Sequence, residues 1–343
     1  MTSDASGLVG IDCIFCGHGA ASDVVIRENG YDGRQCRACG LVYVSPRPRL
    51  EAIIDLYGHN EAHVSASSHL AAGYSKRLYA RNALGIIRRH AREGDLLEIG
   101  AGAGHFLDEA RRLGFRPRAI EFNGIQANYI RNTLGLECAS QPLSSTPFPG
   151  VAFDVIYHCD VISHLYDPIG EFRDMHRALR PGGLLVFETG NIGDIAPRHY
   201  ALFRKFQYPD HLFFFGRENL ARLLEMTGFE LVEIHGYAIQ LDLLLERSRH
   251  RLRRLARRLL RGSSGHEPTG VAQAPGGESS QPPPAPQNRL VAALKRADQY
   301  LNFVIRYRVG RWLPKGKRPQ TMIIVARRVD DRNQQSEAPT HAA

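Results

Sequence analysis

A glycine-rich turn between a short apolar run and a helical pattern constrains this chain most. Residues 96–107 read L-L-E-I-G-A-G-A-G-H-F-L, with glycines at positions 100, 102 and 104. Glycine lets the backbone take left-handed conformations and approach a ligand where a β-carbon would collide. The segment therefore predicts a strand, a tight ligand-binding turn and a helix.

Short apolar runs alternate with helical stretches through the middle of the chain. The runs predict strands at Leu96–Ile99, Arg118–Ile120, Phe153–Tyr157, Leu184–Phe187 and Glu230–Ile234, and the helical stretches include Phe106–Leu113 and Ile169–Leu179. This alternation is typical of a doubly wound α/β domain, in which helices cover both faces of a mostly parallel sheet. Ligands of such sheets bind at the carboxyl ends of the strands.

Two acidic residues at the ends of the first two predicted strands narrow the choice of ligand. Glu98 would repel a pyrophosphate but suits the ammonium group of S-adenosylmethionine, and Glu121 can accept hydrogen bonds from both hydroxyls of a ribose. A dinucleotide-binding turn would place its third glycine one position later, where His105 stands. The pattern favours S-adenosylmethionine over a nicotinamide cofactor.

Several motifs in order resemble the class I S-adenosylmethionine-dependent methyltransferases over most of residues 90–237. They are E-x-G-x-G-x-G at 98–104, the acid Glu121, F-D-V-I at 153–156, S-H-L-Y-D-P at 163–168 and L-R-P-G-G at 179–183. The resemblance implies a Rossmann-like sheet of seven strands. It also implies the donor-binding residues Glu98, Gly100, Gly102, Gly104, Glu121, Phe122 and His158.

Four cysteines near the start form two C-x-x-C pairs, Cys13 with Cys16 and Cys36 with Cys39, each followed by glycine. Four thiolates at this spacing predict a closed tetrahedral site for a structural zinc ion, in a ribbon over residues 1–46 that is too small to hold a core without metal. The ribbon resembles that of bacterial methyltransferases, including sugar C-methyltransferases, which implies that it shapes the acceptor pocket. With no disulfide framework and no signal peptide, the expected location is the cytoplasm.

The acceptor side is predicted from Q-Y-P-D-H-L-F-F-F-G at 207–216. This stretch resembles Y-H-E-H-L-S-Y-F-S of the sugar C-methyltransferases, which implies His211 as general base, with Asp210 or Tyr208 orienting it or the acceptor. A histidine that only holds the loop is an equally supported interpretation. His164, after the fourth strand, is the second candidate base.

The remaining residues divide into a helical lead-in or lid over 47–90, a core over 91–238 and 319–330, and an insertion over 239–318 before a last strand at Gln320–Arg327. Within the insertion, residues 262–288 are rich in Gly, Ser, Pro and Gln and predict a disordered linker, as does the tail 331–343.

The insertion carries much of the formal net charge of +9. Its two helical segments, at 239–261 and 289–313, place apolar residues on one face and arginines on the other. Such helices can lie in an anionic membrane interface at the inner face of the membrane, or they can pack on the core with a solvated basic face. The sequence leaves both interpretations open.

The predicted function is methyl transfer to a small-molecule acceptor, at a hydroxyl or carbon of a saccharide, glycolipid or other secondary metabolite, which membrane contact would make lipid-linked. The alternative is a nucleic-acid-binding or nucleic-acid-methylating protein that uses the ribbon and the basic helices. The chain lacks an N/D-P-P-Y/F segment for amino-group methylation and paired catalytic cysteines for pyrimidine chemistry. These absences disfavour a nucleic-acid partner.

Overall fold

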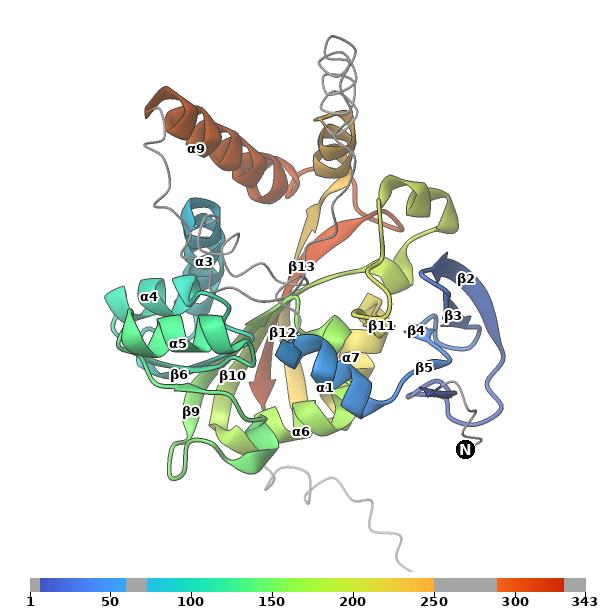
Figure 1. Ribbon diagram of the computed structural model, residues 1–343, viewed down its shortest axis with the longest axis horizontal. Coiled ribbons are helices and arrows are strands. Elements are labelled where there is room, and N and C mark those ends of the chain that lie inside the picture. Colours follow the sequence, from blue (N-terminus) through green and yellow to red (C-terminus); the bar gives the residue numbers. More distant parts are fainter. Residues whose placement is uncertain (1–6, 60–72, 250–288, 330–343) are drawn as a thin grey trace, which may run out of the picture.

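A computed structural model describes residues 7–59, 73–249 and 289–329, and its centre is a seven-stranded sheet (Figure 1). The strand order is β12-β13-β10-β9-β6-β7-β8. The strands are β6 (Gly94–Ile99), β7 (Phe115–Ile120), β8 (Cys138–Ala139), β9 (Phe153–Cys159), β10 (Leu179–Gly190), β12 (Phe229–Ala238) and β13 (Gln320–Arg328). Only β13 among them runs antiparallel to its neighbours, β10 and β12. The α/β fold class expected from the sequence is confirmed.

Helices cover both faces of this sheet. Those on one face are α6 (Pro168–Ala178) and α7 (Arg217–Met226), and those on the other are α3 (Gly73–Ile87) and α4 (His105–Arg112), while α5 (Gly124–Asn132) packs beside β8. Local sequence fixes their starts: the Asp167 side chain accepts a hydrogen bond from the Gly170 amide at 3.0 Å and caps α6, with Pro168 in the first turn.

Alternate residues along each strand fill two separate core layers. Leu97, Ile156 and Phe187 face α6 and α7, whereas their neighbours Leu96, Val155 and Val186 face α3 and α4. Because both faces are covered, the central strand β6 is buried along its whole length, whereas β12 at the sheet edge is partly exposed. The connections diverge after β6, so a crevice is expected at its carboxyl end.

The N-terminal segment builds a second, four-stranded sheet in the order β11-β4-β3-β2. Its strands are β2 (Ser22–Glu28), β3 (Tyr31–Cys36), β4 (Val42–Val44) and β11 (Phe213–Phe214), while β1 (Leu8–Val9) pairs with β5 (Arg47–Pro48) ahead of α1 (Leu50–His59). Strand β11 belongs to the segment after β10, yet it pairs with β4 through Phe213 opposite Tyr43. The ribbon and the core domain therefore share one sheet.

The insertion begins directly after β12, at the carboxyl edge of the central sheet. A helix over residues 240–249 is followed, after the residues that the structure does not describe, by α9 (Arg289–Phe303), a π-helical turn at Val304–Val309 and β13. The rest of the expected helix at 239–261, the linker 262–288 and the tail 331–343 lie outside the described residues. The second helix ends earlier than the expected residue 313.

Four short 3-10 turns complete the described elements. They are η1 (Leu143–Ser145), η2 (Ile162–His164), η3 (Ile192–Asp194) and η4 (Pro197–Leu202). Within the described ranges, no helix is long and apolar enough to cross a lipid bilayer.

Candidate functional site

The glycine-rich turn follows β6 at the centre of the sheet. Gly100, Gly102 and Gly104 have φ angles of 70°, 55° and 69°, in the left-handed region that disfavours other residues. A β-carbon on Gly100 would lie 2.7 Å from Cγ2 of Val161, and one on Gly104 would lie 2.7 Å from Cδ1 of Leu134. Side chains other than glycine are therefore disfavoured throughout this turn, and Gly100 is exposed at its start.

Glu98 places a buried carboxyl group at the start of this turn. Glu98 is buried at 6% exposure, and its Oε2 has no hydrogen-bond partner in the described part of the chain. Burial, and then the nearby Glu121 carboxylate, raise the pKa of Glu98 well above its ordinary value of 4.5. A cationic group bound beside Glu98 would favour its ionised form and lower its pKa.

Glu121 stands at the end of β7 and is held by the glycine-rich turn at residues 100–104, which is called the donor loop below. Its Oε2 accepts a hydrogen bond from the Gly102 amide at 2.6 Å, and its Oε1 accepts one from the Asn123 amide at 2.8 Å. Burial raises the pKa of Glu121 despite these bonds. Each carboxylate oxygen keeps a lone pair for a ligand hydroxyl. The next residue, Phe122, exposes 52% of its surface at the same edge and offers an apolar surface.

His158 does not fit the donor-binding role expected from the sequence. The side chain is fully buried, and neither ring nitrogen has a hydrogen-bond partner in the described residues. Its ring stacks on Phe187 at 4.9 Å and meets Phe172 edge-on at 6.0 Å, on the side of the sheet that α6 covers. Burial lowers the pKa of His158 to about 3, so the ring is a neutral core residue.

The structure brings His164, Asp210 and His211 together at the carboxyl edge of the sheet. His164 ends the turn after β9, and the other two residues precede β11; the Leu212 amide donates to the Ser163 carbonyl at 2.7 Å and joins the two loops. One ligand atom from each of the three side chains lies within 4.8 Å of the others. The sequence predicted all three residues as candidates, with Asp210 or Tyr208 expected to orient His211 or the acceptor.

The Asp210 side chain contacts His164. Its Oδ1 lies 3.1 Å from Nδ1 of His164, and the rings of His164 and His211 meet edge-on at 4.5 Å. Burial, and secondarily the neighbouring His164, lower the pKa of His211 from 6.5 to about 3. The hydrogen bond of the Asp210 carboxylate goes to His164, and the expected orientation of His211 by Asp210 stays a prediction.

Tyr208 is also placed differently from expectation. Its ring is buried in the cluster formed by the ribbon and the segment before β11, and a β-carbon on Gly33 of β3 would lie 2.0 Å from its hydroxyl oxygen. Burial raises the pKa of the phenol. Tyr208 packs the loop onto the ribbon, a position that does not fit the catalytic role expected from the sequence.

A ribbon residue that sequence reasoning missed holds the same loop. The Glu28 carboxylate accepts hydrogen bonds from three successive amides, those of Phe206 at 2.6 Å, Gln207 at 2.7 Å and Tyr208 at 3.3 Å. The Asn29 side chain donates to the Tyr208 carbonyl at 2.8 Å. No motif marks a contact between residues so far apart in the chain, so only the fold reveals it.

Another buried acid, Glu188, lies on the α3 side of the sheet. Glu188, on β10, accepts a short hydrogen bond from the hydroxyl of Tyr307, which comes from the π-helical turn of the insertion. Burial, and then the nearby Asp160, raise the pKa of Glu188 to about 7. The pair attaches the insertion to the core and was absent from the sequence expectation.

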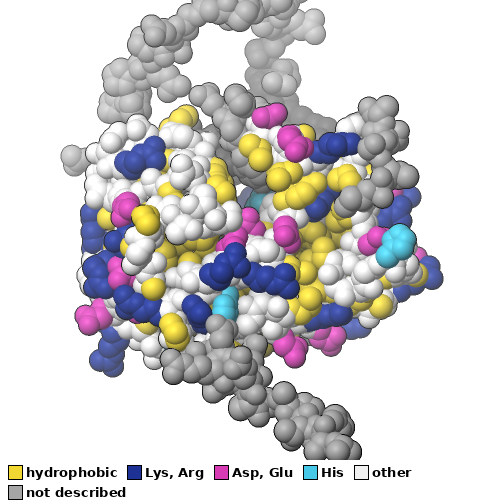
Figure 2. Space-filling model, turned by 90° about the horizontal axis from the view of Figure 1, so that it is seen from below, with side chains coloured by type: hydrophobic (Ala, Val, Ile, Leu, Met, Phe, Trp, Pro, Cys, Tyr) yellow, Lys and Arg dark blue, Asp and Glu magenta, His cyan; other side chains and the backbone are white. Residues whose placement is uncertain are grey.

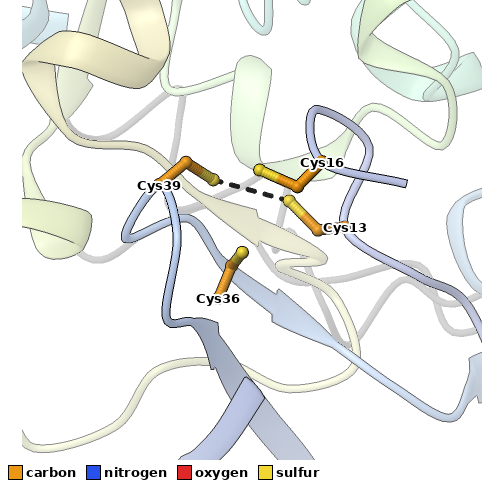
Figure 3. A group of neighbouring side chains, drawn as sticks. All are labelled: Cys13, Cys16, Cys36 and Cys39. Atoms are coloured by element: carbon orange, nitrogen blue, oxygen red, sulfur yellow. Dashed lines mark hydrogen bonds between the residues drawn. The ribbon is translucent and has the colours of Figure 1, made fainter. Parts of the chain in front are cut away.

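The four N-terminal cysteines converge on one point (Figure 3). Their sulfur atoms lie within 4.8 Å of one another, and those of Cys13 and Cys39 are 3.5 Å apart. Zn–S bonds of about 2.3 Å in a tetrahedron put sulfurs about 3.8 Å apart, so the donor set fits zinc. Gly17 and Gly40 both have φ of 74° and donate amides back to the carbonyls of Cys13 and Cys36.

Part of the chain resembles known methyltransferases. A family model described as a methyltransferase domain matches residues 70–234. A probable S-adenosylmethionine-dependent methyltransferase of Mycolicibacterium smegmatis is 27% identical over 143 residues, or 41% of this chain and 54% of that protein. A ubiquinone biosynthesis O-methyltransferase of Ruegeria pomeroyi is 29% identical over 165 residues, or 41% of this chain and 62% of that protein.

The chain thus spans less than two thirds of these relatives. Among solved structures, a putative sarcosine dimethylglycine methyltransferase from Galdieria sulphuraria aligns at 14% identity, with a TM-score of 0.45, over 74% of this chain and 86% of that one. The matched residues contain the glycine-rich turn, both acids and five strands of the seven-stranded sheet. Residues 70–234 therefore match a methyltransferase domain, and one of the relatives is named a probable S-adenosylmethionine-dependent methyltransferase.

Proposed function

We propose that the whole chain transfers a methyl group from S-adenosylmethionine to a hydroxyl group of a small-molecule acceptor. The observation that carries this proposal is the contact between Asp210 and His164, 3.1 Å long, at the edge of the sheet where the donor loop opens. A hydroxyl acceptor must lose a proton during transfer, and a carboxylate-held imidazole can accept it.

The donor side supports the same proposal. S-adenosylmethionine supplies a methyl group already activated by its sulfonium, so the protein has to orient the two reactants. Glu98 would bind the ammonium group and Glu121 the ribose hydroxyls, while the left-handed turn leaves room for the donor. The unpartnered Oε2 of Glu98 is the group that most needs such a ligand.

The contacts favour His164 over His211 as the base. With Nδ1–H donated to Asp210, the Nε2 of His164 carries the lone pair that would receive the acceptor proton. His211, whose pKa is lowered to about 3, is too weak a base to hold a proton near neutral pH and would instead orient the acceptor as a neutral ring. The proposed roles reverse the order expected from the sequence.

The proposal defines the acceptor by its chemical group, a hydroxyl. Two relatives, from Ruegeria pomeroyi and Parvibaculum lavamentivorans, are named ubiquinone biosynthesis O-methyltransferases, and the second is 33% identical over 100 residues, covering 28% of this chain and 40% of that protein. These names favour oxygen as the methylated atom. A phenol, a saccharide or a glycolipid would each present such a hydroxyl.

We further propose that the four cysteines bind a structural zinc ion. Four thiolates leave no open coordination position, so the metal would take no part in methyl transfer. Its role would be to fix the ribbon, which is too small to hold a core without a metal. The ribbon in turn holds the acceptor loop through Glu28.

The nucleic-acid alternative receives less support from the surface. Seen from below, Lys and Arg side chains lie among Asp and Glu side chains (Figure 2). At the amino ends of the strands, for example, Asp95 is paired with Arg116, Arg118 and Arg180. A single-sign field of the kind that attracts a polyanion is not presented there.

The test begins with labelled methyl donor added to a cell extract, which is then separated into lipid, saccharide, protein and nucleic-acid fractions. With the labelled fraction as acceptor, His164→Ala should lower turnover about 10²–10⁴-fold while donor affinity stays nearly intact. His211→Ala, the matched control in the same cluster, should act mainly on KM for the acceptor. The opposite pattern would restore His211 as the base, and label in nucleic acid alone would refute the proposal.

A further inference from the structure

The insertion stands at the same edge of the sheet as the donor loop. The helix over 240–249 starts two residues after the end of β12, which runs parallel to β6, so it leaves the core where the glycine-rich turn also opens. Figure 1 shows this helix and α9 projecting from that end of the molecule. A partner bound by the insertion would therefore lie close to the carboxyl edge of the sheet, where the donor loop opens.

The insertion is firmly attached to the core along one side. The Arg306 guanidinium pairs with Asp242 of the first helix, its Nε and Nη2 donating at 2.9 Å and 2.6 Å, and Tyr307 donates to Glu188. Phe303 stacks on Tyr79 of α3 at 6.1 Å. Phe303, Ile305 and Tyr307 are buried by this packing. The other apolar residues of the insertion are left over.

The apolar side chains of the insertion that do not pack on the core lie together on helix faces and are exposed. On α9, Val291, Leu294 and Leu301 follow at spacings of three and seven residues, with Leu294 62% and Leu301 50% exposed. The first helix exposes further apolar surface at Leu241 and Leu244. Apolar helix faces of this kind are not needed for packing and suit an apolar phase.

Trp312 extends this surface at its far end. It is 84% exposed and is the only tryptophan in the chain. Beside it, Arg311, Lys315 and His235 line a hollow of about 270 Å³. Tryptophan favours the boundary between lipid headgroups and acyl chains, and two adjacent cations suit a phosphate headgroup.

The charge of this segment selects the partner. Residues 289–318 contain nine Lys and Arg residues and one acidic residue, Asp298. Lys295, Arg296 and Arg308 are exposed on the same helix and turn as the leftover apolar residues. A nucleic acid would satisfy the cations but not the exposed leucines, whereas an anionic bilayer satisfies both.

We propose that the helix over 240–249 and residues 289–318 form a docking surface for an anionic phospholipid bilayer. The surface inserts Leu294, Leu301 and Trp312 between headgroups, and its cations bind the lipid phosphates. Docking places the donor loop at the bilayer surface, which selects acceptors that reside in the lipid phase. This last consequence rests on the proposed methyl transfer, whereas docking itself does not.

The test uses the full chain and vesicles, without methyl donor, so that its outcome is independent of catalysis. Vesicles of phosphatidylglycerol and phosphatidylcholine should shift the emission of Trp312 to shorter wavelength and co-sediment with the protein at low salt. Pure phosphatidylcholine vesicles, or addition of 0.5 M salt, should reduce binding at least about tenfold, because the attraction is electrostatic.

Variants locate the surface. Leu294→Ser with Leu301→Ser should weaken co-sedimentation at least about tenfold, whereas the matched control, Leu231→Ser with Val232→Ser, two exposed residues of β12, should change it less than twofold. No emission shift on anionic vesicles at low salt would overturn the proposal, as would equal binding by both double variants. Binding of a short DNA duplex as tight as vesicle binding would overturn it in favour of a polyanion site.

Discussion

Replacing Glu188 by glutamine should change how stability depends on pH. In the folded protein, burial raises the pKa of Glu188 from 4.5 to about 7, whereas in the unfolded chain water surrounds the carboxyl group and returns it to its ordinary range. Below pH 4.5 both states hold the proton. As the pH rises, the unfolded state releases it first, so stability falls until the folded state also ionises near pH 7.

The size of this effect follows from the two pKa values. A tenfold difference in proton affinity corresponds to about 1.4 kcal/mol, so the shift at Glu188 amounts to about 3 kcal/mol of stability lost between pH 4.5 and pH 7. Glu188→Gln has no proton to release. Its stability relative to the wild type should therefore rise by about 2–3 kcal/mol between pH 5 and pH 8.

The assay is urea unfolding followed by circular dichroism at several pH values, because exposed Trp312 reports poorly on the core. Tyr307→Phe removes a hydroxyl that stabilises the Glu188 carboxylate, so the fall in stability should still begin near pH 4.5 but extend to higher pH. Glu230→Gln, on the surface of β12, controls for a glutamate-to-glutamine change as such. Parallel wild-type and Glu188→Gln curves from pH 5 to pH 8 would refute the reasoning.

Three other predictions address the donor, the metal and the loop. Glu98→Gln and Glu121→Ala should each weaken S-adenosylmethionine binding by about 1.5–3 kcal/mol in calorimetry. Binding to the wild type should release a proton, because the ammonium group lowers the raised pKa of Glu98. Unchanged affinity in both variants contradicts the donor site. Metal analysis should find one zinc per chain, lost in Cys36→Ser, whereas a second zinc lost only in His164→Ala would assign a metal to the acceptor cluster. Glu28→Ala should lower turnover of the labelled acceptor fraction without changing donor affinity, and Glu28→Gln, which keeps one acceptor oxygen, should recover part of it; equal turnover in all three proteins would remove the positioning role.

Sequence patterns were sufficient where a structure depends on neighbouring residues. The alternation of apolar runs and helical stretches located the strands to within a few residues, since both are local patterns. The strand β8 escaped because Cys138 and Ala139 form too short a run to stand out. The three left-handed glycines could be placed because a turn after a buried strand leaves few alternatives.

Contacts between distant segments could not be read in this way. Histidine is a residue type that often binds ligands. Strand alternation, however, points His158 into the layer beneath α6, where it packs on Phe187 and Phe172. That packing is not visible in the sequence. The partner of Asp210 depended on how two loops meet, not on its neighbour His211 in the chain. Glu28, 178 residues from Phe206, had no signal at all.

The pairing of β11 with β4 limits where this protein can be cut. A truncated chain that starts at Leu50 would look like a clean removal of an accessory segment, but it would strip the partner from β11 and uncover Phe213 and Phe214, which are now buried. An unpaired strand with two aromatic side chains is a template for association with other chains. Such a fragment should aggregate on expression, and the isolated segment 1–49 would lack its outermost strand. Any shortened version for crystallography or engineering should keep both pieces together.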